Sequence, residues 1–192
     1  DVLKARDRAW VLSSWQVIVD EYPVMGTEIK ITTAAYEFKG FMGMRNFIIE
    51  TTDGKRLAWA NSNWTHLVIS TGLPARLTPA DTDNYVLSKK MEMDYAPRKI
   101  KLPDSMIPQE SFAVQKHHLD TNHHVNNCQY ICMAEDFLPE DFKVYQMRAE
   151  YKMQAKLGDT ICPKTKTEAG KVVVSLNDEN GKPYAVVEFT EK

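Results

Sequence analysis

The chain has 192 residues, of which 43% are hydrophobic, 10% aromatic and 26% charged, and this excludes a disordered or low-complexity chain. Its 24 basic and 26 acidic side chains give a net charge of −2, without the basic excess typical of nucleic-acid binding, so we expect no nucleic-acid partner. No segment approaches 18 consecutive apolar residues, and we therefore expect no membrane span.

The first part of the chain is predicted to form strands. Residues 10–20 alternate between apolar and polar side chains, and residues 28–33, 45–50 and 57–69 are rich in Ile, Thr, Phe and Trp. Asp53-Gly54 favours a tight hairpin turn, because such a turn needs positive φ. We interpret residues 1–73 as a first β-rich unit.

A proline-rich stretch follows. Five of the nine prolines lie between residues 74 and 108. Proline fixes φ and removes a backbone donor, so this stretch suits neither a central strand nor a long helix. We predict a linker over residues 74–110. Because a linker of that length would be unusual inside one compact domain, it also predicts two units.

Residues 111–192 are predicted to be a second β-rich unit. Residues 111–117 are a short strand candidate, and residues 145–154 alternate over ten positions, which indicates a half-buried strand. Residues 171–176 and 184–189 flank Asn180-Gly181, a strong hairpin signal.

One helix is predicted in this second unit, over residues 125–138. Apolar side chains recur there at helical spacing, and Pro139 would end the helix. Asn122 or Asn126 would cap its N-terminus. A helix that is apolar over most of its surface is expected to be enclosed by a sheet.

An internal repeat relates the two units. Residues 26–29 match residues 158–161 at an offset of 132, and the turn at residues 53–55 matches residues 180–182 at an offset of 127. At these offsets the counterpart of the segment 111–139 would lie almost wholly before residue 1. We therefore expect the first unit to lack its leading strand and helix.

Four of the five histidines lie within eight residues, directly before the predicted helix. Three interpretations remain open: a solvated loop with a helix cap, a metal site without recognised ligand spacing, or a hydrolytic centre. In a hydrolytic centre His124 would be the general base and Asp120 would orient it. The Asn122 amide and the N–H groups of the helix N-terminus would hold a substrate carbonyl oxygen.

The three cysteines, Cys128, Cys132 and Cys162, form no CxxC pair. An odd number without such a pair argues against a disulfide framework. We interpret them as small buried apolar residues of a protein in a reducing cytoplasm.

The run Asp120-x-Asn122-x-His124-Val125-Asn126-Asn127-x-x-Tyr130-Ile131 closely resembles the active-site motif of acyl-acyl carrier protein (acyl-ACP) thioesterases. The resemblance continues through Glu150-Tyr151-Lys152 and Gly158-Asp159, and it includes Trp10–Trp15 and Ser62-x-Trp64 in the first unit. It implies an α+β fold of two tandem hotdog units (a double hotdog), in which antiparallel sheets wrap a long helix. It also implies hydrolysis of fatty acyl-ACP thioesters to free fatty acid, which ends chain elongation.

The resemblance also implies roles for particular residues. Asp120, Asn122 and His124 match the catalytic positions of the family, and the motif suggests substrate-binding positions at Asn126, Asn127 and Tyr130.

A fourth catalytic position falls on Gln154, where the family often has an acidic residue. Strict alternation would put Gln154 on the same face as Glu150 and Lys152, unless a bulge intervenes.

The implied partners are acyl-loaded ACP and its fatty acyl chain. No metal or other cofactor is expected, and a homodimer is compatible with the resemblance. Two alternatives stay open. One is another hotdog enzyme, such as an acyl-coenzyme A thioesterase or a hydroxyacyl dehydratase, and the other is a non-catalytic acyl-binding hotdog protein.

Overall fold

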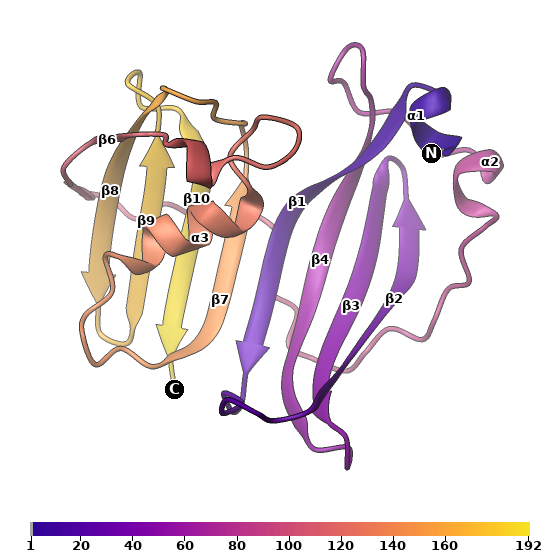
Figure 1. The fold of residues 1–192 in the computed structure, drawn as a ribbon, viewed down its shortest axis with the longest axis horizontal. Coiled ribbons are helices and arrows are strands. Elements are labelled where there is room, and N and C mark those ends of the chain that lie inside the picture. Colours follow the sequence, from indigo (N-terminus) through magenta and orange to yellow (C-terminus); the bar gives the residue numbers. More distant parts are fainter. Residues whose placement is uncertain (1) are drawn as a thin grey trace. The chain divides into compact units, whose positions relative to one another are not determined.

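The computed structural model describes residues 2–192, which form two compact units (Figure 1). The first unit ends at Ala96 and the second runs from Pro97 to Lys192. The proline-rich stretch 74–110 is thus divided between them. No helix in the described part of the chain is long and apolar enough to cross a membrane.

The first unit is a four-stranded antiparallel sheet with the order β2-β3-β4-β1. Its elements are α1 (Val2–Ala5), β1 (Arg8–Val19), β2 (Ile29–Lys39), β3 (Met42–Thr51), β4 (Arg56–Val68) and α2 (Pro79–Thr82). Each of the four predicted strand segments lies in one of these strands, except for one residue at an end of three of them. Gly54, in the turn between β3 and β4, has φ +90°, as the hairpin signal required.

One face of this sheet is covered by residues 91–96 of the proline-rich stretch. Gln16 of β1 donates to the carbonyl of Asp94 at 2.8 Å and accepts from the N–H of Ala96 at 2.9 Å. Asn46 of β3 accepts from the hydroxyl of Tyr95 at 3.1 Å. Polar side chains on the strands therefore hold a segment that has no regular structure of its own.

The other face of the first sheet carries aromatic side chains, including Trp15 and Phe47, whose ring centroids lie 4.9 Å apart. Within residues 2–96 the only helices are α1 and α2, each of four residues. This agrees with the repeat offset, which predicted a first unit without a long helix.

The second unit is an antiparallel sheet with the order β7-β10-β9-β8-β5, and β6 pairs with β8. Its elements are β5 (Ile107–Pro108), β6 (Phe112–Ala113), η1 (Lys116–His118), α3 (Asn127–Glu135), β7 (Val144–Tyr151), β8 (Thr160–Glu168), β9 (Lys171–Asn177) and β10 (Pro183–Glu191). Helix α3 crosses one face of this sheet (Figure 1) and buries Tyr130, Met133 and Ala134. Its outer side, with Cys128 and Cys132, is exposed, so the helix is packed on the sheet and not enclosed by it as expected. The strand expected at residues 111–117 is only the two-residue β6, followed by the turn of η1.

The helix is shorter than the predicted range 125–138. At its start, Val125 is extended: it pairs with Leu119 and its N–H donates to the carbonyl of Ala155 at 2.9 Å. At its end, the N–H groups of Phe137 and Leu138 bond to carbonyls three residues back, so the chain tightens out of the α-helix before Pro139. The apolar periodicity thus continued beyond both helical ends.

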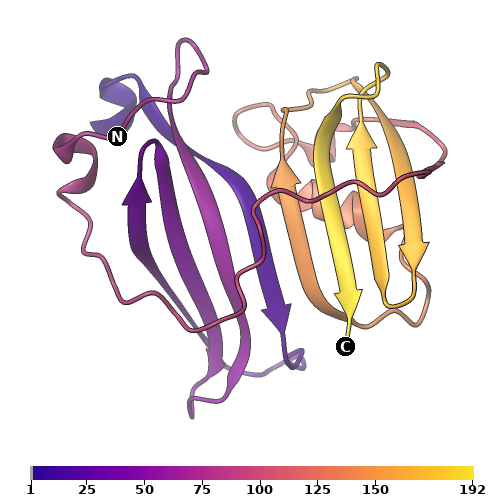
Figure 2. The same cartoon turned by 180° about the vertical axis from the view of Figure 1, so that it is seen from behind.

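The opposite face of the second sheet is crossed by the start of the unit (Figure 2). Arg148 of β7 donates to the carbonyl of Pro97 at 2.5 Å and pairs with Glu188 at 2.7 Å. The N–H of Ile100 donates to the Glu150 carboxylate at 3.1 Å, and the Ile100 side chain is buried. The sheet is therefore covered on both faces.

Candidate active site

The histidine-rich segment closes into a small loop before α3. The N–H of Asp120 donates to the carbonyl of His124 at 2.8 Å, and the N–H of His123 donates back to the carbonyl of Asp120 at 3.1 Å. His123 sits at the tip with φ +61°, a left-handed conformation that non-glycine residues rarely adopt. The loop therefore holds His124 in a fixed place relative to the helix that follows.

The carboxylate of Asp120 organises this loop. One oxygen accepts from the N–H of Asn122 at 2.8 Å and from the N–H of His124 at 3.3 Å. The other oxygen accepts from the Asn122 side-chain amide at 3.4 Å. Burial would raise the pKa of Asp120, but these donors, together with His124, lower it below its ordinary value. The side chain is therefore an anion at neutral pH.

At the N-terminus of α3, one backbone N–H group of the described residues has no hydrogen-bond partner. Asn126 is the N-cap: its side-chain oxygen accepts from the N–H of Cys128 at 2.9 Å, and its carbonyl accepts from the N–H of Gln129 at 2.9 Å. The N–H of Asn126 itself donates to the carbonyl of His118. Among the residues that the structure describes, the N–H of Asn127 has no partner. It is available to a ligand oxygen three residues after His124.

The chain beyond β7 comes alongside this loop. The N–H groups of Lys152 and Met153 both donate to the carbonyl of Tyr184, at 2.8 and 3.2 Å. Two consecutive residues opposite one form a β-bulge, so the strict alternation of faces along β7 ends here. After it, His124 and Lys156 form an antiparallel bridge.

Residues directly opposite in such a bridge point to the same side. The N–H of Val125 bonds to the carbonyl of Ala155 at 2.9 Å, so the segment that carries Gln154 runs next to the residue after His124. The side chain of Gln154 is exposed.

Tyr130 is 2% exposed, so its side chain lies in the protein interior. Its hydroxyl accepts from the N–H of Ala155 at 2.8 Å, and burial raises the pKa of Tyr130 to about 12. From the same stretch of chain, the hydroxyl of Tyr151 donates to the carbonyl of Asn127 at 3.1 Å. These two bonds fix the segment that carries Gln154 against the start of α3.

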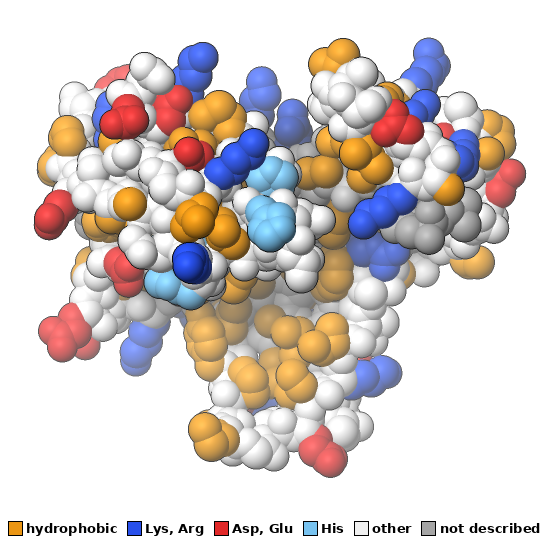
Figure 3. Space-filling view, turned by 45° about the horizontal axis from the view of Figure 1, so that its top comes forward, with side chains coloured by type: hydrophobic (Ala, Val, Ile, Leu, Met, Phe, Trp, Pro, Cys, Tyr) orange, Lys and Arg blue, Asp and Glu red, His pale blue; other side chains and the backbone are white. Residues whose placement is uncertain are grey.

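The two earlier histidines stand on η1. The Nδ1 atom of His118 accepts from the N–H of Gln115 at 2.9 Å, so a neutral His118 carries its proton on Nε2. Burial, and then the neighbouring His117, lower the pKa of His118. Figure 3 shows histidine side chains at the surface with a basic side chain beside them.

No group of three or more His, Cys, Asp or Glu side chains within residues 2–192 is placed to hold a metal ion. The metal interpretation of the histidine cluster therefore gains no support from the described residues.

The structure thus brings Asp120, Asn122 and His124 into one loop, and the segment that carries Gln154 runs beside that loop. Asn126 and Asn127 form the adjoining helix start. It also adds Lys156, which no sequence motif indicated. Its position two residues beyond Gln154 on an extended segment was the only available signal.

Comparison with known proteins gives matches over most of the chain. Residues 1–85 match the family described as acyl-ACP thioesterase N-terminal domain, and residues 103–188 match the acyl-ACP thioesterase C-terminal domain. A chloroplastic acyl-[acyl-carrier-protein] hydrolase of Cuphea viscosissima is 26% identical over 169 residues, covering 81% of this chain and 40% of that protein. The chloroplastic palmitoyl-acyl carrier protein thioesterase of Arabidopsis thaliana is 27% identical over 160 residues, covering 76% and 38%. The chain therefore spans about two fifths of the length of these relatives.

Solved structures show the same fold. An acyl-ACP thioesterase from Bacteroides thetaiotaomicron superposes with a TM-score of 0.89 at 19% identity, covering 99% of this chain and 79% of that one. The 12:0-ACP thioesterase from Umbellularia californica gives 0.87 at 17% identity, covering 100% and 78%. A MaoC-like dehydratase from Phytophthora capsici gives 0.64 at 13%, covering 95% and 69%. At these identities the likeness shows the fold alone, which is the double hotdog that the motif implied.

Proposed function

Because this chain belongs to the acyl-ACP thioesterase family, we propose that it hydrolyses fatty acyl thioesters of ACP to free fatty acid and carrier protein. One observation carries the proposal. The unpartnered N–H of Asn127 at the start of α3 follows three residues after His124, on a loop whose shape the Asp120 carboxylate fixes. A base and an oxyanion donor in this order are what thioester hydrolysis needs.

The proposed reaction starts at His124. Its neutral imidazole takes a proton from a water molecule while the water oxygen forms a bond to the thioester carbonyl carbon. The carbonyl electron pair moves to its oxygen and gives a tetrahedral oxyanion. When the intermediate collapses, the carbon–sulfur bond breaks and the imidazolium returns its proton to the leaving thiolate.

The oxyanion is proposed to lie at the N-terminus of α3. The aligned peptide dipoles of a helix concentrate partial positive charge there, and the N–H of Asn127 belongs to the first residue of that helix. One donor of this kind is worth about 3 kcal/mol of transition-state stabilisation. The cap bond from Asn126 to Cys128 keeps this first turn rigid, so the donor is in place before substrate binds.

Asp120 and Gln154 have supporting roles in this proposal. The ionised Asp120 stabilises the imidazolium that forms on His124, and its bond to Asn122 keeps that amide at the edge of the site. Gln154, on the side of His124, orients the attacking water through its amide. Tyr130 fixes the segment that carries Gln154 rather than contacting the reacting atoms.

The test is the release of fatty acid from a panel of acyl-ACP thioesters of increasing chain length, using the full-length protein. The same acyl groups on coenzyme A form the comparison set. We expect release from at least one acyl-ACP, at a higher kcat/KM than from the matching coenzyme A thioester. A His124→Ala protein prepared in parallel reports contaminating thioesterases.

Other outcomes separate the remaining alternatives. Faster hydrolysis of coenzyme A thioesters would make the protein an acyl-coenzyme A thioesterase. Hydration of an enoyl thioester without hydrolysis would identify a dehydratase. Binding of acyl-ACP with no turnover at any chain length would leave a non-catalytic acyl-binding protein.

We further propose that the protein works in the cytoplasm as a homodimer. Cys128 and Cys132 are exposed and not buried as the sequence analysis expected, because they lie on the outer side of α3. They are free thiols four residues apart, which suits a reducing compartment. The edge strand β2 exposes Ile29 and Ile31, and an apolar sheet edge favours pairing with a second copy. Light scattering of the purified full-length protein should give twice the chain mass, and a monomer at micromolar concentration would contradict this.

A further inference from the structure

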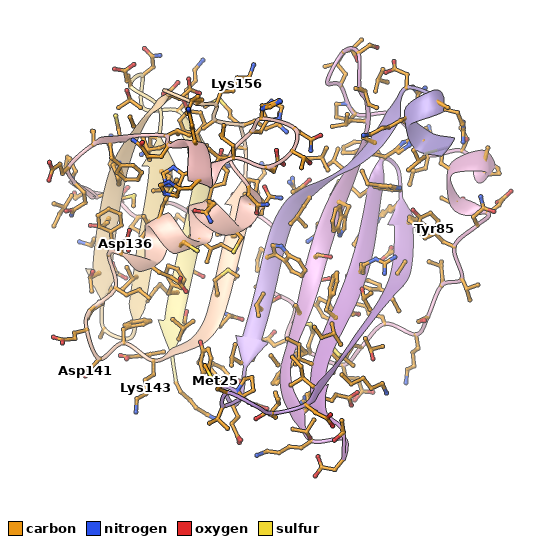
Figure 4. The ribbon with its side chains drawn as sticks, viewed as in Figure 1. Met25, Tyr85, Asp136, Asp141, Lys143 and Lys156 are labelled. Atoms are coloured by element: carbon orange, nitrogen blue, oxygen red, sulfur yellow. The ribbon has the colours of Figure 1, made fainter. Side chains whose placement is uncertain are left out.

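Two exposed cysteines lie one helical turn apart on α3, in the second unit. Cys128 and Cys132 are four residues apart, so their side chains project from the same face of the helix with Cβ atoms about 5–6 Å apart. Figure 4 shows α3 in front of the strands of its sheet, with Asp136 at its C-terminal end, so its outer side faces the reader. Neither the motif nor the proposed mechanism uses these thiols.

The two thiols interact with each other. Partial burial raises the pKa of the Cys132 thiol, and the charge of Cys128 and a hydrogen bond between the two side chains raise it further. That hydrogen bond keeps the two sulfur atoms next to each other, as the second step of disulfide formation requires. Cys162, the third cysteine, lies on β8.

A disulfide between these positions needs a movement of the helix. The Cα atoms of residues one turn apart are about 6 Å from each other, within the range that a disulfide can join. The Cβ atoms of a disulfide, however, are only about 3.5–4.5 Å apart, so the two side chains must approach by about 1 Å or more. The bridge is therefore possible but strained, and strained disulfides are the ones that are readily reduced.

The part of α3 around Cys132 resists such a movement. Tyr130, Met133 and Ala134 are all buried, and Ala134 is fully so. The hydroxyl of Tyr130 also accepts from the N–H of Ala155 at 2.8 Å. A displacement at Cys132 would open a packed interior, which is costly.

The part around Cys128 yields more easily. Its N–H is held by the exposed side chain of Asn126 at 2.9 Å, a cap bond at the end of the helix. Closing the bridge therefore moves Cys128 toward Cys132 and pulls it away from Asn126. Asn127, whose unpartnered N–H is the proposed oxyanion donor, lies between these two residues and moves with them.

We propose that Cys128 and Cys132 are a site of reversible oxidation, which closes to a disulfide and displaces the first turn of α3. The effect on turnover rests on the function proposed above, because the displaced turn carries its oxyanion donor. The co-reactant is a low-molecular-weight disulfide such as oxidised glutathione.

The reaction has two thiol–disulfide exchange steps. The Cys128 thiolate bonds to one sulfur of the small disulfide, whose sulfur–sulfur bond breaks and releases one small thiolate. The Cys132 thiolate then bonds to the Cys128 sulfur and releases the second. The two cysteines lose two protons and two electrons, and the small disulfide is reduced to two thiols.

The first measurement is the mass of one peptide after treatment of the full-length protein with oxidised glutathione. Trypsin cleaves after Lys116 and Lys143, so a single peptide carries both cysteines. When free thiols are alkylated before digestion, we expect this peptide to carry no alkyl group and to be two hydrogens lighter than the reduced peptide. Cys162→Ser should behave like wild type, and Cys132→Ser should not form the bridge. A wild-type peptide that is alkylated twice, or that carries only glutathione, overturns the inference.

The second measurement is hydrogen exchange of the amides of Cys128 and Gln129, which both bond to Asn126. Oxidation should speed their exchange by about fivefold, the factor that corresponds to one N-cap bond, and should leave the amide of Val174 on β9 unchanged. Dithiothreitol should restore the original rates, which gives the comparison without any substitution. A disulfide that forms without faster exchange overturns the proposed displacement.

The third measurement is acyl-ACP hydrolysis before and after oxidation. We expect kcat of wild type and Cys162→Ser to fall by about tenfold or more, because complete loss of one oxyanion donor costs about 100-fold or more. Cys132→Ser should be unaffected by the oxidant. Equal turnover by the reduced and oxidised proteins overturns the coupling to the site. If the bridge forms and exchange speeds up but the reduced protein releases no fatty acid, the oxidation site stands and the proposed hydrolysis fails.

Discussion

The carboxylate of Asp120 both holds the loop together and carries a negative charge next to His124. Both oxygens accept hydrogen bonds within the loop, and the negative charge faces His124. Asp120→Asn would remove the charge and set an amide against the Asn122 amide that now donates to it. The residue therefore couples the shape of the loop to the electrostatics of the base.

We expect His124→Ala and Asp120→Asn each to lower kcat by about 100-fold or more, the usual contribution of a general base and its support. The measurement is steady-state hydrolysis of acyl-ACP, with circular dichroism to confirm folding. His117→Ala is the matched control, because His117 is exposed and lies outside the loop. Equal losses in all three proteins would instead indicate a folding effect.

The substitution Gln154→Glu tests whether residue 154 lies on the side of His124. If it lies on the side of His124, Gln154→Glu places a second carboxylate near the imidazole and stabilises its protonated form. A higher pH is then needed to deprotonate the imidazole, so the acidic limb of the pH–rate profile should move to higher pH. Gln146→Glu, the same change on β7 itself, is the control. A folded Gln154→Glu protein with an unchanged profile would place residue 154 outside the site.

At the scale of single elements, the start of α3 depends on one side chain. Asn126 satisfies the N–H of Cys128, and its loss should cost about 1 kcal/mol of stability. We expect Asn126→Ala to lower the urea midpoint and also to lower kcat, since the Asn127 donor would lose its rigid setting. Asn126→Ser, which can still cap, should retain most of the stability. If Ser is as damaging as Ala, the cap bond is not the cause.

The strands and turns were predictable because their signals are local. Alternation marked β1 and β7, and Asp53-Gly54 and Asn180-Gly181 marked two hairpins. The ends of α3 were wrong because apolar periodicity cannot tell helix from the extended Val125 or the tight turn at Leu138. Both residues are apolar for packing reasons that continue past the helix.

The proline-rich stretch was harder to interpret. Composition correctly excluded long elements there, but it could not show that the stretch covers both sheets. The signal was on the strands: Gln16, Asn46, Arg148 and Glu150 are polar residues at largely covered positions, and each bonds to this stretch. Such partners are tertiary and lie about 50 or more residues away in most cases, which no sequence window reveals.

In the candidate site too, the parts that depend on local sequence could be predicted and the parts that depend on tertiary pairing could not. Asp120, Asn122 and His124 share a short motif and a single loop, so the sequence could bring them together. The backbone of Lys156 pairs with that of His124, although the whole of α3 and β7 separates the two residues in the sequence. Gln154 was placed by resemblance, and its setting depends on a bulge that alternation cannot predict.

At the scale of the whole molecule, each unit is stabilised by contacts that join distant parts of its own chain. In the first unit Asp81 of α2 is the centre of such a set. Its side chain is 3% exposed, pairs with Arg6 at 3.0 Å and faces the buried His66 of β4 at 3.7 Å. Thr78 donates to it through both its N–H and its hydroxyl, at 2.9 and 2.6 Å. This one carboxylate therefore ties α2 to β4 and to the start of the chain.

Asp81 should give the first unit a pH-dependent stability. Burial alone would raise the pKa of Asp81, but the donors of Thr78, and then His66 and Arg6, lower it below its ordinary value. A depressed folded pKa stabilises the protein above the unfolded value of about 3.9, and the contribution is lost as the pH falls through the folded value. Asp81→Asn should therefore lower the free energy of unfolding of this unit by about 1–3 kcal/mol at neutral pH, and the difference should narrow in acid. Urea unfolding followed by tryptophan fluorescence reports this unit, because all four tryptophans lie in it. Asp83→Asn, at an exposed neighbour, is the control. A difference that stays constant from neutral pH into acid would show that Asp81 acts through its shape rather than its charge.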